Sequence, residues 1–269
     1  MILDRQTILS LVATIKKAGK IAVDSRKSPE FKVTRKSDNS KLSTSDLLVD
    51  KYLKKILSKL TPNISIISEE SIAQDSHLQE NSLYWLIDPI DGTSNFCAGG
   101  DEFTINIALM KDGFPIFGAI HAPIYDGGKT AYIDENNNLV IELPTSQNRN
   151  SEENIVTVSK NISDEKTESF VEKNLYYEKN NYKMKKISSS VKFFEILQGN
   201  SDIFLMLHNT SEWDIAAGHA LINALGGSIL EASSDELSEF QELRYSKKDF
   251  LNNYLIISSK YGKETCIKL

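Results

Sequence analysis

The sequence has little of what marks secreted or membrane proteins. Its two cysteines, Cys97 and Cys266, are too few for a disulfide framework or a zinc cluster, so we expect reduced thiols. No stretch approaches the roughly 20 apolar residues of a membrane span, and the first residues lack the basic and apolar segments of a signal peptide. We therefore expect a cytoplasmic protein without a membrane span.

The sequence also lacks an excess of positive charge. With 31 Lys and Arg against 37 Asp and Glu, the formal net charge is −6, which disfavours a nucleic acid polymer or an anionic membrane as the partner. A phosphorylated substrate would therefore need local metal ions or lysines. The 269 residues, 40% of them hydrophobic, can bury a full core as one large domain or as two closely packed halves.

The first half of the chain predicts two helices and a largely antiparallel sheet. Apolar residues recur at helical spacing over 5–24 and 44–60. The stretch that begins at Phe31 predicts a short strand followed by a loop. Strands are expected at 64–67 and 83–87, in a hairpin over 102–121, and at 129–133 and 139–143.

The second half predicts another layered unit. The polar stretch 144–154 is the best candidate boundary, which divides the chain into residues 1–145 and 146–269. Alternation of helices and strands beyond it is typical of a sheet covered by helices. The expected strands are 155–159, 184–187, 203–207, 228–230 and 254–258, and the expected helices are 164–173, 191–198 and 214–225.

The most informative stretch is 83–96, where an apolar strand leads into Asp-Pro-Ile-Asp-Gly-Thr. Because Pro89 prevents a helix, we expect the strand to end before Asp88, with Asp88 and Asp91 on a turn. Two carboxylates directed at one spot repel each other unless a cation lies between them. Their hard oxygen atoms favour Mg²⁺, Mn²⁺ or Ca²⁺ over zinc.

Gly92 and Thr93 follow directly. A residue without a Cβ beside a hydroxyl lets main-chain N–H groups approach a phosphate closely. An ordinary turn with a solvated carboxylate is the alternative for Asp-Gly alone, but the whole run from Asp88 to Thr93 favours a metal and phosphate site.

Other acidic residues have ordinary structural explanations beside the functional one. Asp46, with Ser43, precedes a helix and could simply cap it. Glu69 and Glu70 follow a strand and are of a type that is usually solvated. Asp214 suits the first turn of a helix, where the helix dipole favours a negative charge.

Two further side chains could be mistaken for catalytic groups. For Cys97, which has no base near it in the sequence, we favour a packing role. His121, at the end of the expected hairpin, is more typical of a residue at the rim of a sheet.

Four stretches together resemble the inositol monophosphatase superfamily of Mg²⁺-dependent, lithium-inhibited sugar and nucleotide phosphatases. They are Ser43-Thr-Ser-Asp46, Glu69-Glu70, Asp88-Pro-Ile-Asp91-Gly-Thr93 and Trp213-Asp214-Ile-Ala-Ala-Gly218. Within that superfamily, residues 36–40, 102–109 and 188–193 are similar to the 3'(2'),5'-bisphosphate nucleotidase (CysQ-type) branch.

Some features depart from that branch. Residues 93–96 are closer to inositol monophosphatases, and Ser43 stands where a threonine is usual. Met206 occupies the position, seven residues before Trp213, at which these nucleotidases often carry an arginine suited to the non-scissile phosphate. These departures keep an inositol or sugar phosphate open as the alternative substrate.

The resemblance implies an α+β fold, a layered αβαβα sandwich with the active site between the two halves. It implies two or three Mg²⁺ ions per site, held by Glu69, Asp88, the Ile90 carbonyl, Asp91 and Asp214. It implies that Asp46 and Thr93 activate a water with help from Glu69. It also implies substrate contacts from Gly92, Thr93, Ser189, Lys192 and Asp214.

We therefore expect a Mg²⁺-dependent phosphomonoesterase that converts 3'-phosphoadenosine 5'-phosphate to AMP and phosphate. Hydrolysis of inositol-1-phosphate or another sugar phosphate is the alternative reaction. A non-catalytic protein that binds a metal or a phosphorylated ligand is the alternative of another class, but it would be expected to lack one of the ligands. The sequence does not decide the oligomeric state, and a homodimer is compatible with it.

Overall fold

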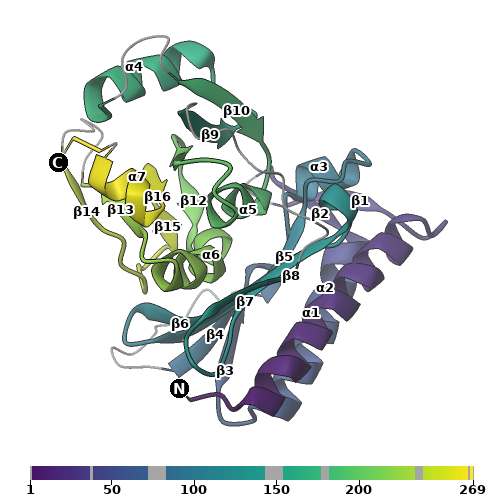
Figure 1. Cartoon of the computed structure of the whole chain (residues 1–269). Helices are drawn as coiled ribbons and strands as arrows, with labels where there is room; N and C mark the ends of the chain where they lie inside the picture. The colour runs from purple at the N-terminus through teal and green to yellow at the C-terminus, as the bar shows by residue number, and fades with distance from the viewer. Residues whose placement is uncertain are drawn as a thin grey trace.

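The computed structural model describes residues 2–36, 39–71, 83–142, 154–176, 182–233, 239–265 and 267–268, of which residue 265 is described by its backbone alone. Helices and sheets alternate in layers across the molecule (Figure 1). A helix pair covers one face of the first sheet, two helices separate that sheet from the second, and a further helix covers the outer face of the second. The predicted αβαβα sandwich is confirmed.

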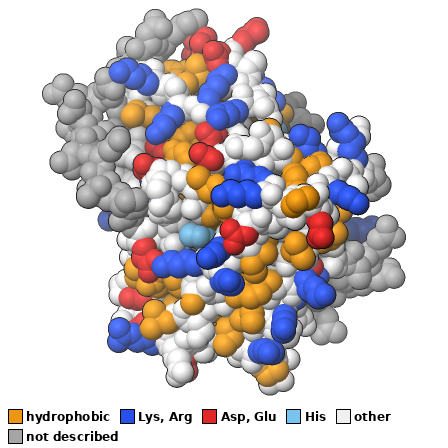
Figure 2. Space-filling model, turned by 90° about the vertical axis from the view of Figure 1, so that its right-hand side faces the viewer, with side chains coloured by type: hydrophobic (Ala, Val, Ile, Leu, Met, Phe, Trp, Pro, Cys, Tyr) orange, Lys and Arg blue, Asp and Glu red, His pale blue; other side chains and the backbone are white. Residues whose placement is uncertain are grey.

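The first layer consists of α1 (Arg5–Arg26) and α2 (Thr44–Leu60), which pack against each other. Asp4 begins α1, since its carboxylate accepts a hydrogen bond from the backbone N–H of Thr7 at 2.8 Å. Between the helices lies the antiparallel hairpin of β1 (Val33–Arg35) and β2 (Lys41–Ser43). The sequence predicted only the first of these strands. Figure 2 looks onto this layer, where Lys and Arg lie among hydrophobic side chains.

The first sheet has the strand order β3-β4-β5-β6-β7-β8. Only its β3–β4 pair is parallel, so the prediction of a largely antiparallel sheet is confirmed. Its strands are β3 (Ser65–Ser68), β4 (Leu83–Asp91), β5 (Thr104–Lys111), β6 (Phe114–Ala122), β7 (Lys129–Ile133) and β8 (Leu139–Glu142). Short helical turns η1 (Glu69–Ser71), α3 (Thr93–Cys97) and η2 (Tyr125–Gly127) follow β3, β4 and β6.

One prediction for this sheet was wrong. Strand β4 does not end at Ile87 but continues through Asp88 and Pro89 to Asp91. Its register with β5 shifts between Asp88 and Asp91, and an irregularity of this kind accommodates a proline, which has no N–H to donate. The two aspartates therefore belong to the irregular end of a buried strand rather than to a turn.

The second sheet has the order β10-β9-β11-β16-β13-β14. Strands β10 (Lys183–Ile187), β9 (Ile155–Ser159) and β11 (Ile203–Met206) are parallel. The remaining pairs are antiparallel and involve β16 (Leu255–Ser258), β13 (Ser228–Ala232) and β14 (Phe240–Glu242). A separate pair joins β12 (Thr210–Ser211) to β15 (Leu251–Asn252). The predicted boundary at 144–154 lies outside the described residues except for Asn154, so the division into two halves stays a prediction.

The middle layer consists of α5 (Val191–Leu197) and α6 (Glu212–Ala224). Two glycines let α6 approach its neighbours. A Cβ at Gly118 of β6 would lie 2.3 Å from the Ala217 carbonyl oxygen, and one at Gly218 would lie 2.2 Å from the Phe193 ring. The main core therefore includes residues from both parts of the chain, such as Trp85 and Phe193.

The outer face of the second sheet has its own core, which includes Phe170 and Val171 of α4 (Asp164–Asn174). Helix α7 (Lys260–Thr265) follows β16. None of the helices described is both long and apolar enough to cross a lipid bilayer.

Candidate active site

Three carboxylates meet between the two sheets. Asp88 and Asp91 come from the irregular end of β4, and Asp214 comes from the first turn of α6. One oxygen from each lies within 4.8 Å of the others. Asp214 is oriented by the backbone N–H of Ser211, which donates to its Oδ2 at 2.8 Å. Residues 126 positions apart thus form one acidic cluster. The sequence pattern predicted that Asp88 and Asp91 lie together, and only the resemblance added Asp214.

Without a cation, burial of these three carboxylates close together lowers the stability of the folded protein. Asp88 is 1% exposed, and its Oδ1 has no hydrogen-bond partner among the described residues. Burial raises the pKa of Asp88 well above its usual range, and the charges of Glu69, Asp91 and Asp214 raise it further. The pKa of Asp214 is likewise raised by burial and then by Asp91. A hard divalent cation would neutralise these carboxylates and occupy the unpartnered oxygen, so the residues present fit Mg²⁺.

Ser190 connects this cluster to the second half of the chain. Its backbone N–H donates to Asp91 Oδ2, and its hydroxyl donates to the Asp214 carbonyl oxygen at 2.9 Å. Asn106 of β5, which lies opposite Asp88 in the sheet, donates to the same hydroxyl at 3.0 Å. The sequence indicated Ser188–Ser190 only through the resemblance and did not predict these bridges.

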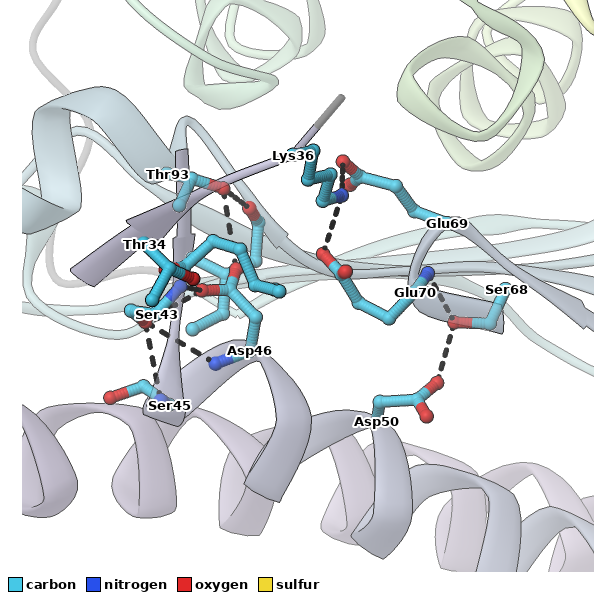
Figure 3. Close-up of polar contacts among 12 residues, drawn as sticks. Thr34, Lys36, Ser43, Ser45, Asp46, Asp50, Ser68, Glu69, Glu70 and Thr93 are labelled. Atoms are coloured by element: carbon cyan, nitrogen blue, oxygen red, sulfur yellow. Dashed lines mark hydrogen bonds and ion pairs between the residues drawn. The ribbon is translucent and has the colours of Figure 1, made fainter. Parts of the chain in front are cut away.

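Glu69 lies on η1 beside the cluster, but its carboxylate is engaged by Lys36 (Figure 3). Lys36 Nζ lies 2.7 Å from Glu69 Oε1 and 3.0 Å from Glu70 Oε1. The Glu70 side chain is 3% exposed, and burial followed by the Glu69 charge raises its pKa to about 7. The solvated-loop explanation therefore fails for this pair. No local sequence pattern predicted Lys36 as the partner of these two glutamates.

Asp46 caps α2 and also holds Thr93 (Figure 3). Its Oδ2 accepts hydrogen bonds from the Ser43 N–H at 2.8 Å and the Ser43 hydroxyl at 2.6 Å. Its Oδ1 lies 3.3 Å from the Thr93 hydroxyl, which also donates to the Ile90 carbonyl at 2.9 Å. Burial raises the pKa of Asp46 against the opposing effect of the Ser43 hydrogen bonds. The capping explanation is correct, and it fixes the carboxylate beside the candidate site.

Gly92 closes the turn after β4 with a left-handed backbone, φ 86°. A Cβ at this position would lie 2.7 Å from the Ser189 Cβ and 2.9 Å from the Glu102 carbonyl oxygen. Both the backbone conformation and the close approach of Ser189 and Glu102 therefore require glycine.

A cavity of about 190 Å³ opens beside the carboxylates. It brings together the predicted residues Gly92, Ser189 and Lys192 with two of the three aspartates. The remaining lining includes residues that the sequence did not single out, among them Ser159, Lys160, Asn161, His208 and Thr210. Glu69, Asp46, Thr93 and Ile90 lie outside this cavity lining, on the side of the first half of the chain.

Lys192 lines this cavity with an ammonium group that lacks a polar partner among the described residues. The residue is 3% exposed, and its ammonium lies 5.2 Å from the centre of the Phe204 ring. The ammonium forms no hydrogen bond or ion pair with any residue that the structure describes, although the backbone N–H of Lys192 donates to the Ser189 carbonyl. Burial lowers its pKa to about 8, while the charges of Asp91 and Asp214 oppose the shift. A buried, unpaired ammonium facing a cavity favours an anionic ligand.

Cys97 and His121 play no part in this arrangement. Cys97 is half-buried against the main core, as predicted, and Cys266 lies outside the described residues. His121 is half-buried at the end of β6, where its Nδ1 lies 3.0 Å from the Thr130 hydroxyl. Neither side chain lines the cavity.

The sequence profile of the Inositol monophosphatase family matches residues 4–269. Similar curated proteins include two 3'(2'),5'-bisphosphate nucleotidases named CysQ. The one from Buchnera aphidicola is 34% identical over 202 residues, which is 73% of this chain and 73% of that protein. The one from Aggregatibacter actinomycetemcomitans is 32% identical over 231 residues, 82% of this chain and 81% of that protein.

Solved structures agree in fold. An IMPase from Thermotoga maritima superposes with a TM-score of 0.73 at 20% identity over 96% of this chain and 93% of its own. CysQ from Bacteroides thetaiotaomicron gives 0.73 at 22% identity, covering 96% and 98%. An IMPase/NADP phosphatase complexed with Mg²⁺ and phosphate gives 0.70 at 16% identity, covering 96% and 91%.

Proposed function

This chain belongs to the inositol monophosphatase family, and on that premise we propose that it is a Mg²⁺-dependent 3'(2'),5'-bisphosphate nucleotidase. The family and its nucleotidase relatives indicate a phosphatase. The proposed reaction converts 3'-phosphoadenosine 5'-phosphate and water to AMP and phosphate. The carrying observation is that two aspartates of the acidic cluster, Asp91 and Asp214, line one cavity with a buried lysine whose ammonium is unpaired.

Asp88, Asp91 and Asp214 would hold the metal, together with the Ile90 carbonyl and Glu69. Bound Mg²⁺, in two or three copies, would neutralise the phosphate charge and lower the pKa of a water molecule. The unpartnered Asp88 Oδ1 supports this ligand set. Glu69, whose carboxylate contacts Lys36 in this structure, would also bind the metal as part of this ligand set.

Asp46 and Thr93 would orient the attacking water. Because the Thr93 hydroxyl directs its hydrogen toward Asp46 and the Ile90 carbonyl, its oxygen lone pairs are free to accept a hydrogen bond from water. Asp46 stays in place through Ser43. No covalent nucleophile is needed, because charge neutralisation accounts for most of the acceleration expected for a phosphate monoester dianion.

Substrate contacts would come from residues of both parts of the chain. Gly92 and Thr93 would offer backbone N–H groups to the scissile phosphate, and Ser189 would lie beside it. Lys192 would carry the charge of the second phosphate, which inositol-1-phosphate lacks. This difference, with the CysQ relatives, favours the nucleotide.

Inositol-1-phosphate is the second candidate because Met206, which lines the cavity, offers no charge to a second phosphate. The deciding experiment measures phosphate release by the purified protein with Mg²⁺ from 3'-phosphoadenosine 5'-phosphate, AMP and inositol-1-phosphate. We expect the highest kcat/KM for the first and inhibition by lithium. Preference for inositol-1-phosphate would replace the proposed substrate. If none of the three compounds releases phosphate, the remaining function is binding of a metal or a phosphorylated ligand without catalysis.

A further inference from the structure

His208 is a residue of the cavity that the proposed reaction does not use. It lies in the loop between β11 and β12, two residues after Met206. Together with Ser159, at the end of β9, it lines the same cavity as Lys192. This part of the cavity therefore combines an imidazole, a hydroxyl and a buried ammonium.

Both ring nitrogens of His208 are fixed. Nδ1 lies 3.0 Å from the Asn209 carbonyl oxygen, and Nε2 lies 3.0 Å from the Ser159 hydroxyl. Because a carbonyl only accepts hydrogen bonds, Nδ1 carries the hydrogen. In the neutral ring Nε2 accepts from Ser159. In the protonated ring Nε2–H donates to Ser159 Oγ, and the hydroxyl hydrogen becomes available to a ligand.

The charges around this pair favour an anion. Burial lowers the pKa of His208, and the Asn209 carbonyl opposes the shift; the charges of Lys192 and Lys166 add to it, and the charge of Asp91 opposes it. An anion beside Lys192 would offset the effect of the Lys192 charge. Lys160 and the N–H of Ser188 already bind the two oxygens of Glu102, so this nearby carboxylate is neutralised.

Other lysines do not supply the missing charge at Met206. Lys185 pairs with Glu195 at 2.6 Å, and Lys186 pairs with Asp164 at 2.6 Å. Neither lines the cavity. Lys160 does line the cavity but pairs with Glu102 at 2.7 Å. A second anionic group of the substrate would therefore meet Lys192, Ser159 and His208.

We propose that the Ser159 hydroxyl, held in place by His208, donates a hydrogen bond to a second anionic group of the substrate and thereby determines specificity. This second group lies on the part of the substrate that departs from the scissile phosphate. Ser159 contacts the anion, and His208 is a positioning residue that accepts a proton from solvent as the anion binds. The inference rests on the proposed nucleotidase function, because only a substrate with two anionic groups would use this pair.

The test compares Ser159→Ala, His208→Phe and the double variant with the wild type. We expect KM for 3'-phosphoadenosine 5'-phosphate to rise about tenfold in each single variant with kcat little changed, since Ser159→Ala removes the donor and His208→Phe removes the imidazolium that orients the Ser159 hydroxyl and adds positive charge beside the anion. The double variant should be no worse than either single variant, because the two residues act as one unit. KM for inositol-1-phosphate should not change.

Asn209→Ala is the matched control, since it keeps the backbone carbonyl that holds Nδ1 and should leave KM unchanged. Calorimetric binding of 3'-phosphoadenosine 5'-phosphate gives a second readout that does not depend on turnover. Weaker binding in both single variants supports the inference even if no substrate is hydrolysed, in which case only the proposed function fails. Unchanged binding, additive losses, or equal losses for inositol-1-phosphate would overturn it.

Discussion

Asp46 and Asp214 show how one side chain serves both folding and chemistry. Each stands at the third position of a helix and accepts the backbone N–H of the residue before that helix, at 2.8 Å in both cases. This cap fixes the carboxylate rotamer. The remaining bonding capacity is then directed at Thr93 for Asp46 and at the acidic cluster for Asp214. Capping and function are therefore compatible explanations for the same residue.

Asp91→Asn and Asp214→Asn should each abolish turnover, because each removes a charge from the proposed metal ligands without changing core volume. Removal of like charge should leave the metal-free protein equally stable or more stable. Phosphate release and thermal unfolding of the metal-free protein measure the two effects. Asp101→Asn, at an exposed position, is the control. Substantial Mg²⁺-dependent activity in a folded Asp91 or Asp214 variant would exclude that residue as an essential ligand.

Thr93→Ala and Asp46→Asn should lower kcat by about 10²-fold or more, because the attacking water would lose its orientation. Thr93→Ser is the matched control, since it keeps the hydroxyl and should retain most of the activity. Mg²⁺ affinity, measured by calorimetry, should change less than kcat. A parallel loss of Mg²⁺ affinity would place these residues among the metal ligands instead.

Among the elements, the amphipathic helices were the most predictable from sequence and the end of β4 the least. Helical periodicity is a local signal, whereas β4 continues past Pro89 because of its pairing with β5, a contact between separate segments. The same limit applies to the site. The Asp-Pro-Ile-Asp pattern predicted an acidic cluster, but the Lys36–Glu69 pair joins residues 33 positions apart and the Ser190–Asp91 bond joins residues 99 apart. No local pattern encodes such contacts.

Gly218→Val should destabilise the junction of α5 and α6, because the new side chain would meet the Phe193 ring. Overpacking of this kind typically costs about 1–3 kcal/mol, measurable by urea unfolding. Ala224→Val, at an exposed position of the same helix, adds a similar volume and should cost well under 1 kcal/mol. Equal losses in the two variants would show that the α5–α6 contact does not limit stability at residue 218.

For the whole molecule, the important feature is that the main core extends across both parts of the chain. Phe193 and Ile257 belong to the same buried cluster as Trp85 and Ile107. The proposed ligands likewise come from both parts, with Asp88 and Asp91 on β4 and Asp214 on α6 (Figure 1). Metal binding would thus join the two parts, and the acidic cluster should destabilise the metal-free protein as its carboxyls ionise.

The pH dependence of stability gives the final prediction. A carboxyl whose pKa is raised on folding binds more protons in the folded than in the unfolded state, so stability falls as pH rises from the unfolded toward the folded pKa. Glu70, with its pKa raised to about 7, and the strongly raised Asp88 and Asp214 all act in this direction. His121 and His219, with pKa values lowered to about 4, oppose it only up to their unfolded value of 6.5.

Between pH 6.5 and about 7.5 the carboxyls therefore dominate, and the metal-free protein should unfold at lower temperature as pH rises. Saturating Mg²⁺ should raise the unfolding temperature more at pH 7.5 than at pH 6.5, because Mg²⁺ binds the ionised carboxylates. At a Mg²⁺ concentration a hundredfold above Kd, binding adds about 2.7 kcal/mol to the free energy of unfolding. Calorimetric scans with and without Mg²⁺ measure both effects. Asp214→Asn should reduce the pH slope. A metal-free protein that becomes more stable over this interval would show that the buried carboxyls are already ionised at pH 6.5.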